Sequence, residues 1–297
     1  MIVSEVPRPA WRPLVVPMIL VLAWDVGVTV AISFDWIAYR GIEIQYTLYG
    51  TAIALFLGFM VNAAYARWWE ARTLWGSIVN HSRNLGRQAM TLVDETGPDA
   101  VPGLADRMVR AQIAYVHAVR TSLRRQDPPP ELGIYLDEPV RQVVERAANG
   151  PTAVLSHLGR LLAQAHRHGM IDDIARVQIE TTLSTLTDAQ GGLERIRNTP
   201  LPVQYRFLPS FFSRVFCVIL PFAIYADLMW WTPLGSALVS LMFLLAVQVG
   251  KDLADPFRDG VHDVPMTAIT RTIEIDLLEM IGAAPPEVVT PVREVLW

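Results

Sequence analysis

The chain is poor in cysteine, lysine and charge. Its one cysteine, Cys217, cannot form an intrachain disulfide, and no second thiol is present for a cysteine metal site. Lys251 is the only lysine, and arginine supplies the other 24 positive charges. The formal net charge is −4 and there is no basic tail, so nucleic acid is not an expected partner. Only 18% of the residues are charged, whereas soluble domains contain about a quarter.

The sequence also lacks the common catalytic motifs. There is no G-x-S-x-G, P-loop or H-E-x-x-H pattern. His166 and His168 form an H-x-H pair without further ligands, which is typical of a solvated helix end. Asp252, Asp255 and Asp259 are expected at helix ends and turns, although they could also be the remnant of a calcium site. We therefore predict no enzyme, no cofactor and no metal.

The residues that are present indicate a membrane protein with a large polar part. Hydrophobic residues make up 52% of the chain, and the mean hydropathy is +0.30. No alternating strand pattern is found, so the predicted fold class is all-α. The predicted organisation is a cytosolic N-terminal arm (1–10), transmembrane helices 1 and 2 (11–66), a helical cytosolic domain (67–207), transmembrane helices 3 and 4 (208–250) and a cytosolic C-terminal segment (251–297).

Arginine is distributed unevenly around the second apolar segment. The loop before it contains Asp35, Arg40 and Glu43, whereas Arg67, Arg72, Arg83 and Arg87 follow it. Positive residues remain in the cytosol, so both termini and the region after residue 67 are predicted to lie inside. No cleavable signal is expected at the N-terminus.

One carboxylate lies inside the first predicted span, which covers residues 11–33. A charge at this depth costs several kcal/mol unless it is paired, protonated or in a wet cavity. Asp25 is therefore either an ion-facing or proton-sensing group, or a partner in an interhelical hydrogen bond to a threonine, asparagine or tryptophan. We expect the hydrogen bond.

The second predicted span carries two stripes with a period of four residues, which place each set on one helix face. The first contains small residues that allow close helix packing: Gly50, Ala54 and Gly58. The second is graded from hydroxyl to aliphatic to aromatic: Thr51, Leu55 and Phe59. The second stripe either faces lipid or a partner helix, or faces a central axis as a narrow apolar pore lining.

Helical periodicity continues through the rest of the chain. The polar region is expected to form helices at 104–123, 139–148, 153–166 and 174–197, the last capped by Asp172 or Asp173. Two apolar segments follow at 211–225 and 234–249. An amphipathic stretch at 267–281 has Ile269, Ile273 and Leu277 as its apolar stripe.

Four sequence elements, in order, resemble the bestrophin family of ion channels. The longest is G-F-x-x-N-x-x-Y-x-R-W-W-E-A-R-x-L-W-G at 58–76, which contains Arg67, Trp68, Trp69, Glu70 and Arg72. The others are G-G-L-E-R with T-P-L-P and Tyr205 (191–205), L-A-D-P-F ending in Asp255, Pro256 and Phe257, and H-D-V-P at 262–265. The resemblance covers about residues 11–283. Within it, Arg67, Glu70 and Arg72 are either a gating ion pair or, as we expect, an anchoring network between subunits.

The resemblance implies a homopentamer around one pore in a bacterial inner membrane, in contact with lipid and conducting monovalent ions. The family's neck positions fall on Thr51, Leu55 and Phe59, and Thr51 departs from the apolar pattern. The cytosolic aperture falls on Ile174. Eukaryotic members bind calcium through a run of consecutive acidic residues after the N-P-F-G element. At that place this chain has only the spaced Asp255, Asp259 and Asp263, so calcium activation is not expected.

The charge near Ile174 suggests a preference for cations. Five protomers carry 5 × −4 = −20, and Asp172 with Asp173 would place ten carboxylates around the aperture. Arg176 opposes this field, and eukaryotic relatives favour chloride, so an anion channel is the alternative within the class. The alternatives outside it are a membrane-embedded enzyme or lipid handler centred on Asp25, and a non-conducting scaffold.

Overall fold

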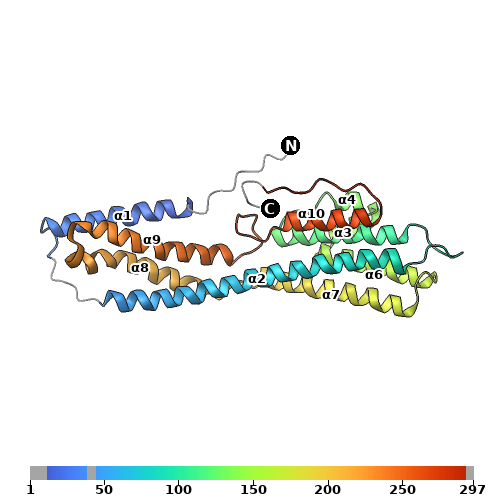
Figure 1. The fold of residues 1–297 in the computed structure, drawn as a ribbon, viewed down its shortest axis with the longest axis horizontal. Helices are drawn as coiled ribbons and strands as arrows, with labels where there is room; N and C mark the ends of the chain where they lie inside the picture. The colour runs from blue at the N-terminus through green and yellow to red at the C-terminus, as the bar shows by residue number, and fades with distance from the viewer. Residues whose placement is uncertain (1–11, 39–44, 292–297) are drawn as a thin grey trace. The chain divides into compact units, whose positions relative to one another are not determined.

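The structure, a computed structural model, describes residues 12–38 and 45–291. The predicted N-terminal arm, together with Arg40 and Glu43 of the first loop, lies outside these residues. Helices are the only regular elements in the described ranges, so the all-α prediction is confirmed. The helices, shown in Figure 1, are α1 (Arg12–Ser33), α2 (Tyr46–Leu92), α3 (Leu104–Arg124), α4 (Leu132–Tyr135), α5 (Glu138–Arg146), α6 (Gly150–Arg167), α7 (Asp173–Asn198), α8 (Val203–Leu228), the 3-10 helix η1 (Met229–Trp231), α9 (Thr232–Leu253) and α10 (Met266–Met280).

The chain divides into two compact units. The apolar unit contains α1, α2 as far as Trp68, α8, η1 and α9, together with residues 254–256 and 261–263. The polar unit contains the rest of α2, α3 to α7, α10 and residues 257–260. Helix α2 has 47 residues and is much longer than the predicted span. No proline and no pair of adjacent glycines occurs between Tyr46 and Leu92 to end the helix earlier.

The apolar unit is built from helices that pack along their lengths. Helix α9 contacts both α1 and α8, and α1 also contacts α8. Phe216, Leu220 and Ile224 of α8 form a buried cluster, against which Tyr46 and Ile53 of α2 pack. Within the described residues, three stretches are long and apolar enough to cross a membrane: Pro13–Ser33, Tyr46–Leu92 and Val203–Leu253.

The count of three stretches differs from the four predicted spans for a structural reason. The third stretch contains both α8 and α9, which are joined without a break by η1. Met229 has a positive φ of 47°, and Thr232 Oγ1 donates a hydrogen bond to the Met229 carbonyl at 2.6 Å. The tryptophan turn between the predicted third and fourth spans is therefore a short helix.

The polar unit is organised around α3. Most of its residues are buried, and it packs against α6, α7, α10 and the short α4. Its Gln112 donates to Ser82 of α2 at 2.8 Å, and Tyr115 donates to the Leu186 carbonyl of α7 at 3.1 Å. The amphipathic prediction for the C-terminal helix is confirmed, because Ile273 and Leu277 of α10 are fully buried.

The turn between α6 and α7 places the predicted aperture residue at the start of a helix. Gly169, with φ of +66°, takes a left-handed conformation that favours glycine. Asp172 is the N-cap of α7, and its side chain accepts a hydrogen bond from the Ala175 N–H at 2.7 Å. The predicted cap is therefore confirmed, and Ile174 lies in the first turn of α7.

Candidate functional site

The two faces of α2 in the apolar unit have different environments. Leu57 and Met60 are buried in a cluster with Val247 of α9. Leu55 and Phe59 are 58% and 54% exposed. Because successive residues turn by about 100° around a helix, Leu55 and Phe59 lie roughly half a turn away from the packed face. The stripe therefore faces away from the other helices of its own protomer.

Thr51 continues this stripe toward the start of α2. Its side chain is exposed, and its hydroxyl donates a hydrogen bond to the Thr47 carbonyl of the same helix at 2.8 Å. The hydroxyl proton is thus used within the helix, and the position offers a methyl group and oxygen lone pairs to its surroundings. Thr51 therefore presents a less polar surface than a threonine whose hydroxyl proton is not bound within its own helix.

The small-residue stripe has two kinds of surroundings. At Gly50 an added Cβ would lie 3.3 Å from Phe216 Cζ, so this glycine permits close packing of α2 on α8. An added Cβ at Gly58 would meet no atom within 4 Å. Ala54 and Gly58 instead line an apolar groove of about 480 Å³ between α2 and α9. The expected helix packing on this stripe is therefore found within the protomer at Gly50 and not at Gly58.

Ile174 is an exposed apolar residue with acidic neighbours. Its side chain is 72% exposed. Asp172 is bound to the helix terminus as its N-cap, while Asp173 Oδ1 lies 2.9 Å from Nε2 of His166. His166 belongs to the H-x-H pair that was expected to be a solvated helix end, and its partner His168 contacts the Asp99 carbonyl at 3.0 Å. The structure thus brings Asp172 and Asp173 next to Ile174, each with a local partner.

The arginine–tryptophan motif of α2 connects that helix to the segment after α9. Arg67 Nε donates to the Ala254 carbonyl at 2.8 Å, and Trp68 Nε1 donates to the His262 carbonyl at 2.9 Å. These contacts hold the residues on either side of Asp255 and Pro256 against α2. Phe257, the last residue of the family's D-P-F element, is buried.

The acidic residue of the motif has a partner in its own chain. Glu70 forms an ion pair with Arg195 of α7. The anchoring network between subunits stays a prediction, to which the structure adds this ion pair within one chain. The two side chains meet because α2 and α7 pack closely at Gly192, where an added Cβ would lie 2.8 Å from Leu74.

Two of the aspartates at and after the end of α9 also have protein partners. Gln248 donates to Asp252 at 2.7 Å, and Asp259 forms an ion pair with Arg124 at 2.6 Å. Among the described residues, no group of three or more His, Cys, Asp or Glu side chains is arranged to hold a metal ion. Asp252 and Asp259 thus serve helix-end and turn contacts.

Asp25 is fully buried in α1, and its environment differs from the one expected. Thr29 donates to the Asp25 backbone carbonyl at 2.8 Å rather than to its carboxylate. The carboxylate lies near Ser236 of α9, yet both carboxylate oxygens and the Ser236 hydroxyl lack partners at hydrogen-bonding geometry within the described residues. The predicted hydrogen bond to a threonine, asparagine or tryptophan is absent from this geometry.

The chain is similar to known proteins over most of its length. A family model described as Bacterial/Fungal Bestrophin protein matches residues 10–279. The voltage-dependent anion channel-forming protein YneE of Salmonella typhi is 37% identical over 265 residues, covering 88% of this chain and 85% of the relative. The voltage-dependent anion channel-forming protein RSc3414 of Ralstonia nicotianae is 33% identical over 283 residues, covering 92% and 90%.

The fold is also that of a solved structure. A crystal structure of a bacterial bestrophin homologue from Klebsiella pneumoniae has a TM-score of 0.84 and 29% sequence identity, and it covers 92% of this chain and 100% of its own. The family match, the identities and the shared fold agree with the motif resemblance from the sequence. The chain belongs to the bestrophin family of ion channels, in its bacterial and fungal branch, and is not an enzyme.

Proposed function

We propose that five copies of this chain form one ion-conducting pore. Its membrane neck would be lined by Thr51, Leu55 and Phe59, and its cytosolic aperture by Ile174. The observation that carries the proposal is the position of the neck stripe on α2. The opposite face of this helix packs on α9, so the exposed stripe is free to face a symmetry axis. Rings of apolar side chains at such an axis gate by dewetting.

The proposed membrane arrangement uses four spans. These are α1, α2 up to about residue 66, α8 and α9, with η1 at the outer surface. In support, the third apolar stretch folds as two helices, and arginine is concentrated after residue 67. We place both termini and residues 67–207 and 251–297 in the cytosol of a bacterial cell, and the spans in its inner membrane in contact with lipid.

Two observations concern ion selectivity: one favours anions and the other favours cations. The relatives are named as anion channel-forming proteins, and this gives no support to a preference for cations. The cation preference is supported by the carboxylates of Asp172 and Asp173 beside Ile174, both of which are exposed. Carboxylates around an aperture concentrate cations there.

The reversal potential under a KCl gradient separates these two selectivities. If the channel prefers cations, the wild-type reversal potential should lie between zero and the potassium equilibrium potential. In the Asp172→Asn, Asp173→Asn double variant it should shift toward zero. Asparagine is as good an N-cap as aspartate, so the change removes charge while retaining the helix start. The recording should use about 0.1 M salt, where the screening length is about 10 Å.

A control removes one charge further along the same helix. Glu180 is exposed on α7 about two turns, or about 10 Å, beyond Asp173, and at about 0.1 M salt its charge is largely screened over that distance, so Glu180→Gln should change the reversal potential much less than the double variant. A wild-type potential at the chloride equilibrium value would establish anion selectivity and overturn the cation preference. An unchanged potential in the double variant would remove Asp172 and Asp173 as its cause.

A further inference from the structure

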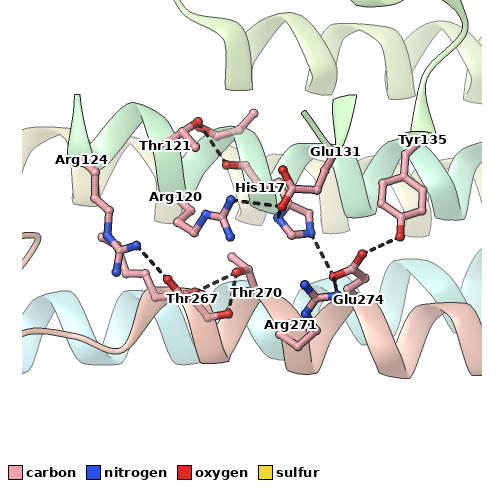
Figure 2. A network of polar contacts seen from close by, with 12 residues as sticks. His117, Arg120, Thr121, Arg124, Glu131, Tyr135, Thr267, Thr270, Arg271 and Glu274 are labelled. Carbon is pink, nitrogen blue, oxygen red and sulfur yellow. Dashed lines mark hydrogen bonds and ion pairs between the residues drawn. The ribbon is translucent and has the colours of Figure 1, made fainter. Parts of the chain in front are cut away.

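A histidine lies buried between two carboxylates in the polar unit, as Figure 2 shows. The side chain of His117, on α3, is 1% exposed. Its Nδ1 lies 3.4 Å from Glu131 Oε1, just before α4, and its Nε2 lies 3.3 Å from Glu274 Oε2, on α10. Among the described residues, these two carboxylates are the charged groups within ion-pair distance of the imidazole.

The two carboxylates have further partners around the ring. Tyr135 of α4 donates its hydroxyl proton to Glu274 Oε1 at 2.5 Å, and its ring stacks on His117 with the centroids 6.5 Å apart. Arg271 Nη1 lies 3.0 Å from Glu274 Oε2, and Arg120 Nη2 lies 3.3 Å from Glu131 Oε1. Three separate segments, α3, the Glu131–Tyr135 segment and α10, therefore meet at one imidazole.

The protonation state of an imidazole decides whether it can serve both carboxylates. An imidazolium has an N–H on each nitrogen and a positive charge, so it attracts both Glu131 and Glu274 at ion-pair distance, while neither contact has the alignment of a hydrogen bond. A neutral imidazole has only one N–H, so its other nitrogen would present a lone pair to a carboxylate oxygen. At this degree of burial, such a contact is unfavourable, because little water is available to solvate the carboxylate.

Glu274 supplies a fixed negative charge to this network. Burial raises the pKa of its carboxyl group, but the close contact with His117, the hydrogen bond from Tyr135 and the charges of His117 and Arg271 outweigh burial and hold the pKa below its usual value. The stability that Glu274 contributes is therefore present above its unfolded-state pKa and is lost only as pH falls through its lower folded-state value. Between about pH 5 and pH 8, histidine is the residue type whose charge changes.

We propose that this network is a pH-sensitive clamp, in which protonated His117 holds α10 and the Glu131–Tyr135 segment on α3, and loss of the proton loosens both. Arg120 and Arg271 stay charged over this range, so each carboxylate keeps an arginine partner, Glu274 also keeps Tyr135, and the segments loosen without unfolding. The clamp lies wholly within the polar unit and does not depend on the pore assignment.

Hydrogen exchange of the full-length protein in detergent, corrected for the intrinsic pH dependence of exchange, tests the clamp. In the wild type, the opening equilibrium of α10 amides should rise about ten-fold between about pH 5.5 and about pH 8, the size expected for losing one charged contact of about 1.4 kcal/mol. In His117→Gln it should be independent of pH. A wild-type α10 with pH-independent protection, or a His117→Gln variant that keeps the pH dependence, would overturn the proposal.

Two further variants complete the test. His157 is partly buried on α6, and His157→Gln should retain the full wild-type pH dependence in α10; loss of the dependence in this variant would overturn the assignment to His117. If His117→Gln does not fold, Glu131→Gln serves instead, because a neutral imidazole can accept from the glutamine amide while donating to Glu274. Its pH dependence should be much reduced, and an undiminished dependence would overturn the clamp.

Discussion

Replacing Leu55 and Phe59 together with alanine should raise ion flux through the protein by about ten-fold or more. Both side chains are exposed on the face of α2 opposite its packed face. If they line the neck, the double variant removes two apolar rings, and each 1.4 kcal/mol by which the barrier to wetting falls is worth about ten-fold in rate. The measurement is flux into liposomes containing equal amounts of each purified variant.

Phe56 provides a matched control for this result. It is 56% exposed, close to the 54% of Phe59, and it lies one residue after Leu55 on the same helix. Its side chain lines a groove of about 490 Å³ between α2 and α8 instead of lying on the stripe. Phe56→Ala should leave flux at the wild-type level. A double variant that assembles normally and conducts like the wild type would refute the neck assignment.

The second large effect is a contrast between two isoleucines of α7. Ile174 is 72% exposed, whereas Ile179, five residues later, is fully buried. Ile179→Ala should lower the free energy of unfolding by about 2–5 kcal/mol, because it removes buried contacts and leaves a cavity. Ile174→Ala should change the free energy of unfolding by less than about 0.5 kcal/mol, and should instead change discrimination between small and large permeant ions.

Both isoleucine variants can be compared by thermal unfolding and by permeability ratios for ions of increasing radius. Ile179→Ala should lower Tm while its surviving channels retain wild-type ratios. Ile174→Ala should keep the wild-type Tm and pass larger ions. A loss of stability in Ile174→Ala without a change in size discrimination would show that Ile174 serves packing and not the aperture.

Much of the fold follows from local signals in the sequence. The N-cap at Asp172 and the apolar stripe of α10 each depend on residues within a few turns of one another, so pattern alone places them. The period of four likewise places Leu55 and Phe59 on one face of α2, whereas the exposure of that face is known only from the structure. The short α4 was not predicted, because four residues are too few to show helical periodicity.

Contacts between distant segments could not be predicted from the sequence. His117, Glu131 and Glu274 come from three elements, and their spacing in the chain follows no local period. In the same way, the ion pair between Glu70 and Arg195 of α7 was not predicted, because the two residues are far apart in the chain. Such partners are set by helix packing, which binary patterns do not specify.

Chemical modification at the neck tests the pore most directly. Cys217 is the only cysteine and is buried, so a Cys217→Ser background can carry a single introduced thiol, either Thr51→Cys on the stripe or Ala52→Cys in the groove beside α8. A charged, water-soluble thiol reagent is added to liposomes containing each variant, with labelling confirmed by intact mass. The pore model predicts that labelled Thr51→Cys loses its flux, whereas Ala52→Cys keeps its flux. Undiminished flux through fully labelled Thr51→Cys would contradict a pore lined by α2.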